Sequence, residues 1–135
     1  MALDIRITGV KEVREPEHYT AYEVAVRTPL WTNRLEKRYS NFLELHRIMK
    51  LRYRLSPALS LPKFPGQKIW KQMFGGLGEA DVEQRKSQLE DYMRQLEANP
   101  CAWDSQYFIE FLQVPQEVVR EWVLFHVAEE QRKEC

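Results

Sequence analysis

The stretch RLEKRYSNFLELHRIM, residues 34–49, changes its hydrophobic period halfway along. Its first part predicts a β-strand from Arg34 to Tyr39. Its second part carries apolar side chains at helical spacing, namely Phe42, Leu45, Ile48 and Met49. Ser40 or Asn41 can cap that helix, because Glu44 follows Asn41 three residues later in a pattern like a capping box. A strand is therefore expected to lead directly into a helix here.

Two further strands are expected before this junction. The first carries Leu3, Ile5 and Ile7 and the second carries Tyr22, Val24 and Val26, each set alternating with polar or small residues. Gly9 interrupts the first strand, residues 14–17 are typical of a turn, and residues 28–33 are expected to form a connecting loop. Three consecutive strands joined by short loops predict an antiparallel meander, which needs a helical layer to cover it.

The helical layer is expected downstream. The first helix should end near Leu55, because Ser56 precedes a proline, and residues 59–66 favour an extended, polyproline-like segment. Further helices are predicted from Ala80 to Ala98, after Asp104 as the cap, and from Pro115 to about Arg132. The sequence thus predicts an α+β fold, with a three-stranded antiparallel sheet packed on a helical subdomain and an extra C-terminal helix. The domain should span residues 1–114, followed by a helical extension over residues 115–135.

Length, composition and charge disfavour several classes of protein. The chain has 135 residues, of which 44% are apolar, enough for one domain with a buried core. No apolar run approaches the roughly 20 residues of a spanning helix, and the N-terminus lacks a basic-then-apolar signal peptide. Two cysteines make no disulfide framework, which favours a reducing compartment such as the cytosol. Twenty basic residues balance twenty acidic ones, so nucleic acid is not expected as a partner.

The charges are nevertheless unevenly distributed. Residues 34–54 hold seven basic side chains against two acidic ones, and residues 61–74 hold three lysines and no acidic residue. These segments can meet in one local anion site. Arg38 at a helix start suits such a site, because a guanidinium matches phosphate oxygens and helical N–H groups add positive potential. Tyr39 could stack on a sugar-like ring. The alternative is an ordinary exposed strand end with one packed aromatic residue.

Arg85 does not fit the amphipathic pattern of its helix. Its spacing places it on the core-facing stripe of that helix, together with Val82, Leu89, Tyr92, Met93 and Leu96. A charged residue at such a position must be paired or must reach a ligand. The alternative is an arginine at the edge of the stripe, which extends into solvent or pairs with a carboxylate.

The loop from Lys63 to Gly78 interleaves large apolar residues with lysines. The apolar residues are Ile69, Trp70, Met73, Phe74 and Leu77, and the lysines among them are Lys68 and Lys71. Tryptophan and phenylalanine among lysines suit an anionic membrane interface. Alternatively, the loop folds back and its rings fill the core.

Enzyme chemistry is nearly absent from the sequence. It contains no nucleophile elbow, no Walker loop and no His-Glu-x-x-His pattern, and its three histidines lack metal-ligand spacing. The chain is therefore expected to be neither an enzyme nor dependent on a cofactor. The last helix carries Val118, Trp122 and Phe125 along one face. This face predicts packing against the domain, and the alternative is a helix that binds a protein partner or forms an oligomer.

Three motifs, taken in order, resemble those of the PX (Phox homology) domain, the phosphoinositide-binding module of sorting nexins and some vacuolar SNAREs. They are Arg-Tyr-Ser-x-Phe from Arg38 to Phe42, then Leu61-Pro62-x-x-Pro65, then Glu83-Gln84-Arg85-Lys86-x-x-Leu89-Glu90-x-Tyr92. The resemblance covers residues 3–114. It implies the same fold, a three-stranded antiparallel sheet with a helical subdomain.

The resemblance also implies the residues of a lipid site. Arg38 would bind the 3-phosphate, Tyr39 would stack on the inositol ring, and Arg85 would bind the 4- and 5-hydroxyls. Lys68 is expected at the 1-phosphate. Lys68 follows the proline turn one position later than is usual, so Lys63 is kept as the other candidate. The residues expected to insert into the membrane are Ile69, Trp70, Met73 and Phe74.

The function implied by the resemblance is the recognition of phosphatidylinositol 3-phosphate on endosomal or vacuolar membranes during protein sorting. The chain would be a peripheral protein on the cytosolic face of these membranes, and it would make or break no bond. The alternative is a protein-interaction module that uses the C-terminal helix, with weak or no lipid binding.

Overall fold

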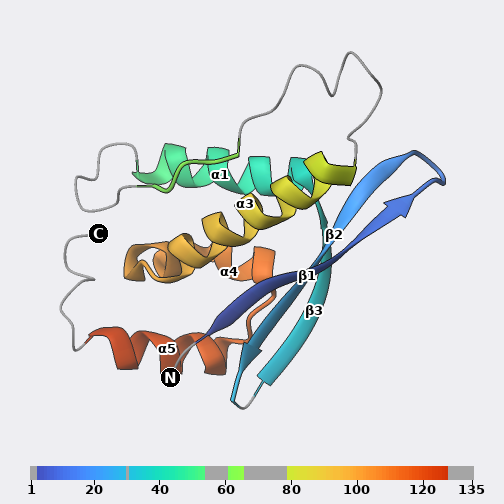
Figure 1. The fold of residues 1–135 in the computed structure, drawn as a ribbon. Coiled ribbons are helices and arrows are strands. Elements are labelled where there is room, and N and C mark those ends of the chain that lie inside the picture. The colour runs from blue at the N-terminus through green and yellow to red at the C-terminus, as the bar shows by residue number, and fades with distance from the viewer. Residues whose placement is uncertain (1–2, 30, 54–60, 66–78, 128–135) are drawn as a thin grey trace.

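The computed structural model describes residues 3–29, 31–53, 61–65 and 79–127. Three strands come first, namely β1 (Asp4–Val13), β2 (Tyr19–Thr28) and β3 (Trp31–Arg38). The helices that follow are α1 (Tyr39–Tyr53), α3 (Glu79–Glu97), the 3-10 helix η1 (Pro100–Asp104), α4 (Gln106–Leu112) and α5 (Gln116–Val127). Figure 1 shows the sheet along one side of the stacked helices. The predicted α+β fold is confirmed.

The three strands form one antiparallel sheet in the order β1-β2-β3. β3 begins at Trp31, so the expectation of a loop over residues 28–33 and a strand from Arg34 is wrong. Trp31 lies opposite Thr28 in the ladder, and the Thr28 hydroxyl donates a hydrogen bond to the Trp31 carbonyl (3.3 Å). Pairing with β2 thus continues to the turn itself and overrides the loop signals in the sequence.

β1 and β2 form a long hairpin that extends beyond β3. The pairing register shifts just before Gly9, so the expected interruption at Gly9 is a bulge within a strand that continues to Val13. β3 ends at Arg38, opposite Ala21, whereas β1 and β2 stay paired for two further residue pairs. The hairpin turn, residues 14–18, therefore lies past the end of β3.

α1 begins at Tyr39, so the expectation that Ser40 or Asn41 caps this helix is wrong. Asn41 lies inside the first turn, where its Oδ1 accepts a hydrogen bond from the backbone N–H of Arg38 (2.8 Å). This bond is the half of a capping box in which a side chain of the first turn reaches back to the cap residue. The strand therefore passes into the helix without an intervening loop.

The later helices agree with the sequence to within a few residues. α3 matches the predicted helix over residues 80–98, and α5 starts directly after Pro115. Its expected continuation to Arg132 lies partly outside the described residues. α4 is capped by Ser105, whose Oγ accepts the N–H of Phe108 (3.4 Å), and not by Asp104, which belongs to η1.

The core lies between the sheet and the helices. Its largest fully buried side chains are Ile5, Tyr22, Phe42, Leu45, Met49, Leu89, Tyr92, Met93, Leu96, Phe108 and Leu112. The apolar faces predicted for α1 and α3 are thereby confirmed. At the start of α5, Val119 is buried and Val118 packs against the core, so this part of the helix packs on the domain. The remaining side chains of the face, Trp122 and Phe125, lie outside the description.

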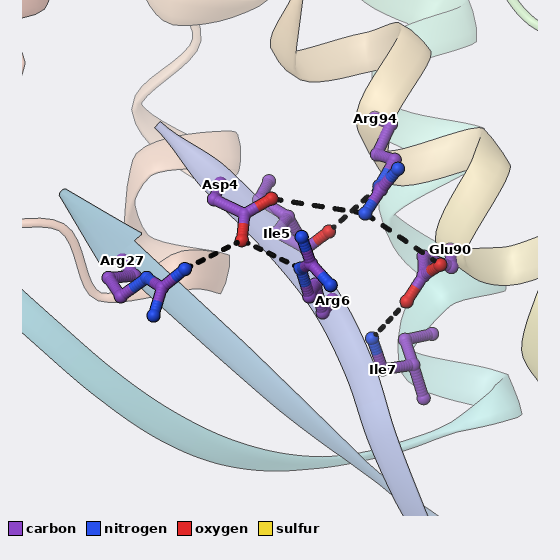
Figure 2. Close-up of polar contacts among 7 residues, drawn as sticks. All are labelled: Asp4, Ile5, Arg6, Ile7, Arg27, Glu90 and Arg94. Atoms are coloured by element: carbon purple, nitrogen blue, oxygen red, sulfur yellow. Dashed lines mark hydrogen bonds and ion pairs between the residues drawn. The ribbon is translucent and has the colours of Figure 1, made fainter. Parts of the chain in front are cut away.

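The outer edge of β1 is bonded to two side chains of α3 (Figure 2). The N–H of Ile7 donates to Oε1 of Glu90 at 2.7 Å. Nε of Arg94 donates to the carbonyl of Ile5 at 3.2 Å, and its guanidinium also pairs with Asp4 (3.9 Å). An edge strand otherwise presents such backbone groups unpaired. These two side chains, the β1 clamp, take the place of a further strand and fix α3 along the sheet.

Glu90→Ala should lower the melting temperature of the domain. The substitution removes the acceptor of the part-buried Ile7 N–H, at a cost of about 1–3 kcal/mol, which corresponds to about 4–10 °C for a domain of this size. Glu90→Gln keeps an oxygen acceptor and should lose less. Thermal unfolding measures both variants, with Asp91→Ala, an exposed position on the same helix, as the control. Equally small changes in all variants would contradict the clamp.

Candidate anion-binding site

The candidate site lies where β3 runs into α1. Arg38, the last residue of β3, lies opposite Ala21 of β2. Arg85 belongs to the N-terminal half of α3, five residues before Glu90 of the β1 clamp. Figure 1 shows the end of β3, the start of α1 and the first turns of α3 on the same side of the molecule. The β3–α1 junction and α3, which are far apart in the sequence, therefore converge here.

Arg85 lies on the ring of Tyr39. Its guanidinium carbon is 4.0 Å from the ring centroid, and the residue is only 4% exposed. This contact is a cation–π interaction, which is stronger when it is desolvated. Burial raises the pKa of the Tyr39 hydroxyl, and the positive charge of Arg85 partly opposes that rise. The alternative in which Arg85 extends into solvent is wrong, because the residue lies inside the domain.

Arg38 contacts the β1–β2 hairpin. Its Nη1 is 2.8 Å from Oε1 of Glu17, and its guanidinium carbon is 4.1 Å from the ring centroid of Tyr19. The side chain of Arg38 is 41% exposed, so its guanidinium is accessible to solutes. Arg38, whose guanidinium is accessible, is therefore the chain neighbour of Tyr39, which contacts the buried guanidinium of Arg85.

Tyr22 is a residue of this region that sequence reasoning missed. It is fully buried, and its hydroxyl has no hydrogen-bond partner within the described part of the chain. Burial raises the pKa of Tyr22 to about 12, the charge of Arg85 opposes that rise, and Glu12 and Tyr39 add to it. The hydroxyl therefore lies in the field of the buried guanidinium. The alternation along β2 identifies Tyr22 only as a core residue, and no sequence signal indicates the polar surroundings.

The proline-containing segment before the loop is anchored on the site. The hydroxyl of Tyr39 donates a hydrogen bond to the carbonyl of Pro65 (2.7 Å). The ring of Phe64 stacks on His46, with centroids 4.9 Å apart and planes at 14°. It also meets the ring of Tyr92 edge-on at 5.1 Å. α1 and α3 together therefore hold this segment in place.

Lys63 is the only one of the two candidate lysines that the structure describes, and it is exposed on this anchored segment. The description does not cover Lys68 or the expected insertion residues Ile69, Trp70, Met73 and Phe74. The structure thus places Arg85 on Tyr39, the chain neighbour of Arg38. The binding roles of these three residues, of the lysine and of the insertion loop all stay predictions.

His46 is a second residue that the motifs did not single out. Its Nδ1 lies 2.8 Å from the hydroxyl of Tyr92. Burial lowers the pKa of His46, and the nearby charge of Lys50 lowers it further. The neutral imidazole can therefore accept the Tyr92 hydroxyl hydrogen. The spacing of four residues from Phe42 could have placed His46 on the apolar side of α1.

The arrangement suits an anionic ligand that also carries hydroxyl groups. Arg38 precedes the first turn of the 15-residue helix α1, whose N–H groups add positive potential. Arg85 supplies a second, buried guanidinium on the ring of Tyr39, the first residue of α1. Within the described residues, no group of three or more His, Cys, Asp and Glu side chains could hold a metal ion. No helix in the same part of the chain is both long enough and apolar enough to cross a bilayer.

Comparison with known proteins gives the family. Residues 29–115 match the PX domain family, more than half of the chain. The chain therefore belongs to the PX domain family, and the resemblance seen in its motifs is confirmed. PX domains are non-catalytic modules that typically bind phosphoinositides.

Individual relatives include sorting nexins. Sorting nexin-17 of zebrafish (Danio rerio) is 34% identical over 117 residues, which cover 87% of this chain and 22% of that protein. A designed CISK-PX domain has a TM-score of 0.70 at 25% identity, over 82% of this chain and 99% of that one. The mouse SNX19 PX domain with a bound sulphate ion has a TM-score of 0.65 at 27% identity, over 84% and 98%. The chain spans about a fifth of the length of its sorting nexin-17 relatives.

Acid should destabilise the domain through His46. Because the fold lowers the pKa of His46, the unfolded chain binds the proton more readily, so this contribution to stability is present above the ordinary pKa of 6.5 and is lost as the pH falls below it. Between about pH 7 and about pH 5, the melting temperature should fall more steeply for the native chain than for His46→Gln. Thermal unfolding across this range measures the difference. Parallel curves would show that His46 does not cause the loss.

Proposed function

We propose that the chain is a membrane-targeting module that binds phosphatidylinositol 3-phosphate on endosomal or vacuolar membranes and acts in protein sorting. One observation carries the proposal: a buried guanidinium, that of Arg85, lies on the ring of Tyr39, and the residue before Tyr39 in the chain is Arg38, whose guanidinium is accessible. A buried guanidinium is stabilised by acceptors for its N–H groups. The ring hydroxyls of an inositol are such acceptors, and its phosphate is a partner for Arg38.

Each residue has one part of the headgroup to bind in this proposal. Arg38 binds the 3-phosphate, because the guanidinium fork matches phosphate oxygens. Arg85 binds the 4- and 5-hydroxyls. Tyr39 packs against the inositol ring with the small part of its surface that is left exposed, which is 8%. Lys68 binds the 1-phosphate, with Lys63 as the other candidate.

A related structure supports an anion site in a domain of this kind. The mouse SNX19 PX domain, which is 27% identical to this chain, has been solved with a bound sulphate ion. Sulphate is a tetrahedral dianion, like a phosphate monoester. An anion of this shape and charge is what the guanidinium of Arg38 would bind.

Insertion of the loop is the second part of the proposed mechanism. Apolar residues enter the lipid while neighbouring lysines favour anionic headgroups. The start of the loop is fixed next to the headgroup site, because Phe64 and Pro65 are held by α1 and α3. The chain then lies on the cytosolic face as a peripheral protein and performs no covalent chemistry. The residues proposed to insert are Ile69, Trp70, Met73 and Phe74.

In this proposal residues 1–114 form the lipid-binding domain and residues 115–135 form a helical extension. Val119 of the extension is buried against the core of the domain. The first turns of the extension therefore contribute to the stability of the domain.

Arg38→Ala should reduce binding to vesicles that contain phosphatidylinositol 3-phosphate by about tenfold or more. The substitution removes hydrogen bonds to a charged group, worth about 1.5–3 kcal/mol. Arg34→Ala is the matched control, because Arg34 is also an exposed arginine of β3 and pairs with Glu23 (3.4 Å). Flotation on vesicles that each carry one phosphoinositide measures both variants. Unchanged binding by a folded Arg38→Ala variant would remove the candidate anion-binding site from the proposal.

The double substitution Trp70→Ala and Phe74→Ala should weaken vesicle binding more than headgroup binding. The soluble headgroup would contact only the candidate anion-binding site, whereas a bilayer would also receive the loop. Buried apolar area contributes roughly 25 cal/mol per Å², so two partly inserted rings supply a few kcal/mol. Melting temperature is measured beside both affinities. If all three decrease together, the two rings fill the core and do not insert.

A further inference from the structure

Arg38, the accessible cation of the proposed site, already forms an ion pair with a carboxylate. Oε1 of Glu17 lies 2.8 Å from Nη1 of Arg38, although 21 residues separate the two in the chain. Tyr19, from the same hairpin, covers the guanidinium at 4.1 Å. Both contacts arise because the β1–β2 hairpin extends beyond the end of β3 (Figure 1). The hairpin thus places a negative charge where an anionic ligand would bind.

We propose that Glu17 is a specificity-determining residue that favours inositol lipids with one phosphate monoester on the ring over lipids with two or three. The proposal rests on the proposed function, in which Arg38 binds the 3-phosphate. Two effects of the Glu17 carboxylate are involved. The first is displacement, which affects every ligand alike, and the second is repulsion, which increases with the charge of the ligand.

Displacement lowers affinity without selecting among phosphoinositides. A phosphate that binds Arg38 must share or replace the Glu17 carboxylate, which is tethered to the same domain and therefore acts at high effective concentration. A phosphate monoester carries a charge of about −1.5 to −2 at pH 7 and three acceptor oxygens, so it competes successfully with a carboxylate. Every phosphoinositide that uses Arg38 meets this same competition.

Repulsion does select, because a displaced Glu17 stays close to the site. Glu17 belongs to a short turn whose last paired residues are Val13 and Tyr19, so its backbone cannot move far from Arg38. The repulsion between its carboxylate and a ligand increases with the charge of the ligand. A second phosphate on the inositol ring is therefore repelled in addition to the first. Specificity obtained by disfavouring the wrong ligand is common in binding sites.

The other carboxylates near the turn of the hairpin are placed differently. Glu12 is engaged by His18 (2.6 Å) and by the hydroxyl of Thr20 (2.8 Å). Glu15 forms no ion pair or hydrogen bond with the described residues. Glu15 therefore offers a matched control, since it carries the same charge in the same turn without the contact to Arg38.

The test compares Glu17→Gln with Glu15→Gln by calorimetry. The two probes are the soluble headgroups of phosphatidylinositol 3-phosphate and of phosphatidylinositol 3,4-bisphosphate. Glu17→Gln should raise affinity about threefold for the first probe and about tenfold or more for the second, because the more highly charged ligand is relieved of more repulsion. Glu15→Gln should change both affinities by less than about twofold, because Glu15 is exposed and makes no ion pair with Arg38. Both side chains are exposed in a turn, so the melting temperature should stay within about 2 °C of the native value.

The outcomes separate this proposal from the proposed function. If Arg38→Ala abolishes headgroup binding but Glu17→Gln raises neither affinity, or raises both equally, the role of Glu17 is wrong and the site stands. If Glu15→Gln shifts the ratio of the two headgroup affinities as much as Glu17→Gln does, the effect comes from net charge and the role of Glu17 is again wrong. If headgroup binding survives Arg38→Ala, the site itself is wrong and the role of Glu17 is overturned with it.

Discussion

The contact of Arg85 with Tyr39 joins the elements of the candidate site. Tyr39 is the first residue of α1, Arg85 comes from α3, and the Tyr39 hydroxyl holds the segment that contains Pro65. A buried guanidinium is unfavourable unless its charge and its N–H groups are compensated. The contact is therefore compatible with burial only while all three elements are in place. The candidate site is in this sense part of the core of the domain, and Tyr39 and Arg85 contribute to the fold whatever they bind.

The position of Arg85 is set by bonds outside the site. Glu90 and Arg94 bond α3 to the backbone of β1, which prevents the helix from sliding along the sheet. On the other side of α3, Tyr92 contacts Phe64 of the anchored segment. Directional hydrogen bonds and packed rings together hold a helix more tightly than an apolar face alone, because apolar burial has no preferred direction. The buried cation can thus be placed to within a narrow range of positions over the tyrosine ring.

Much of the fold follows from local patterns in the sequence. Alternation predicted the strands and helical spacing predicted α1 and α3, because each of these elements buries one face. Arg85 was recognisable as a charge on an apolar stripe. The start of β3 at Trp31 was not recognisable from the sequence, because pairing with β2 across the turn determines where β3 begins. Glu17 and Glu90 could not be identified either, since their partners are 21 and 83 residues away and polar residues on a turn or a helix resemble solvated ones.

The β1 clamp also affects whether other strands can join the sheet. The unpaired backbone groups of an edge strand attract strands from other molecules. On β1 the carbonyl of Ile5 and the N–H of Ile7 are already bonded to side chains, which offer no ladder for a further strand to continue. A strand from another chain could pair there only after α3 had left the sheet, and α3 carries Arg85. Extension of the sheet at Ile5 and Ile7 of β1 and an intact contact between Arg85 and Tyr39 therefore exclude each other.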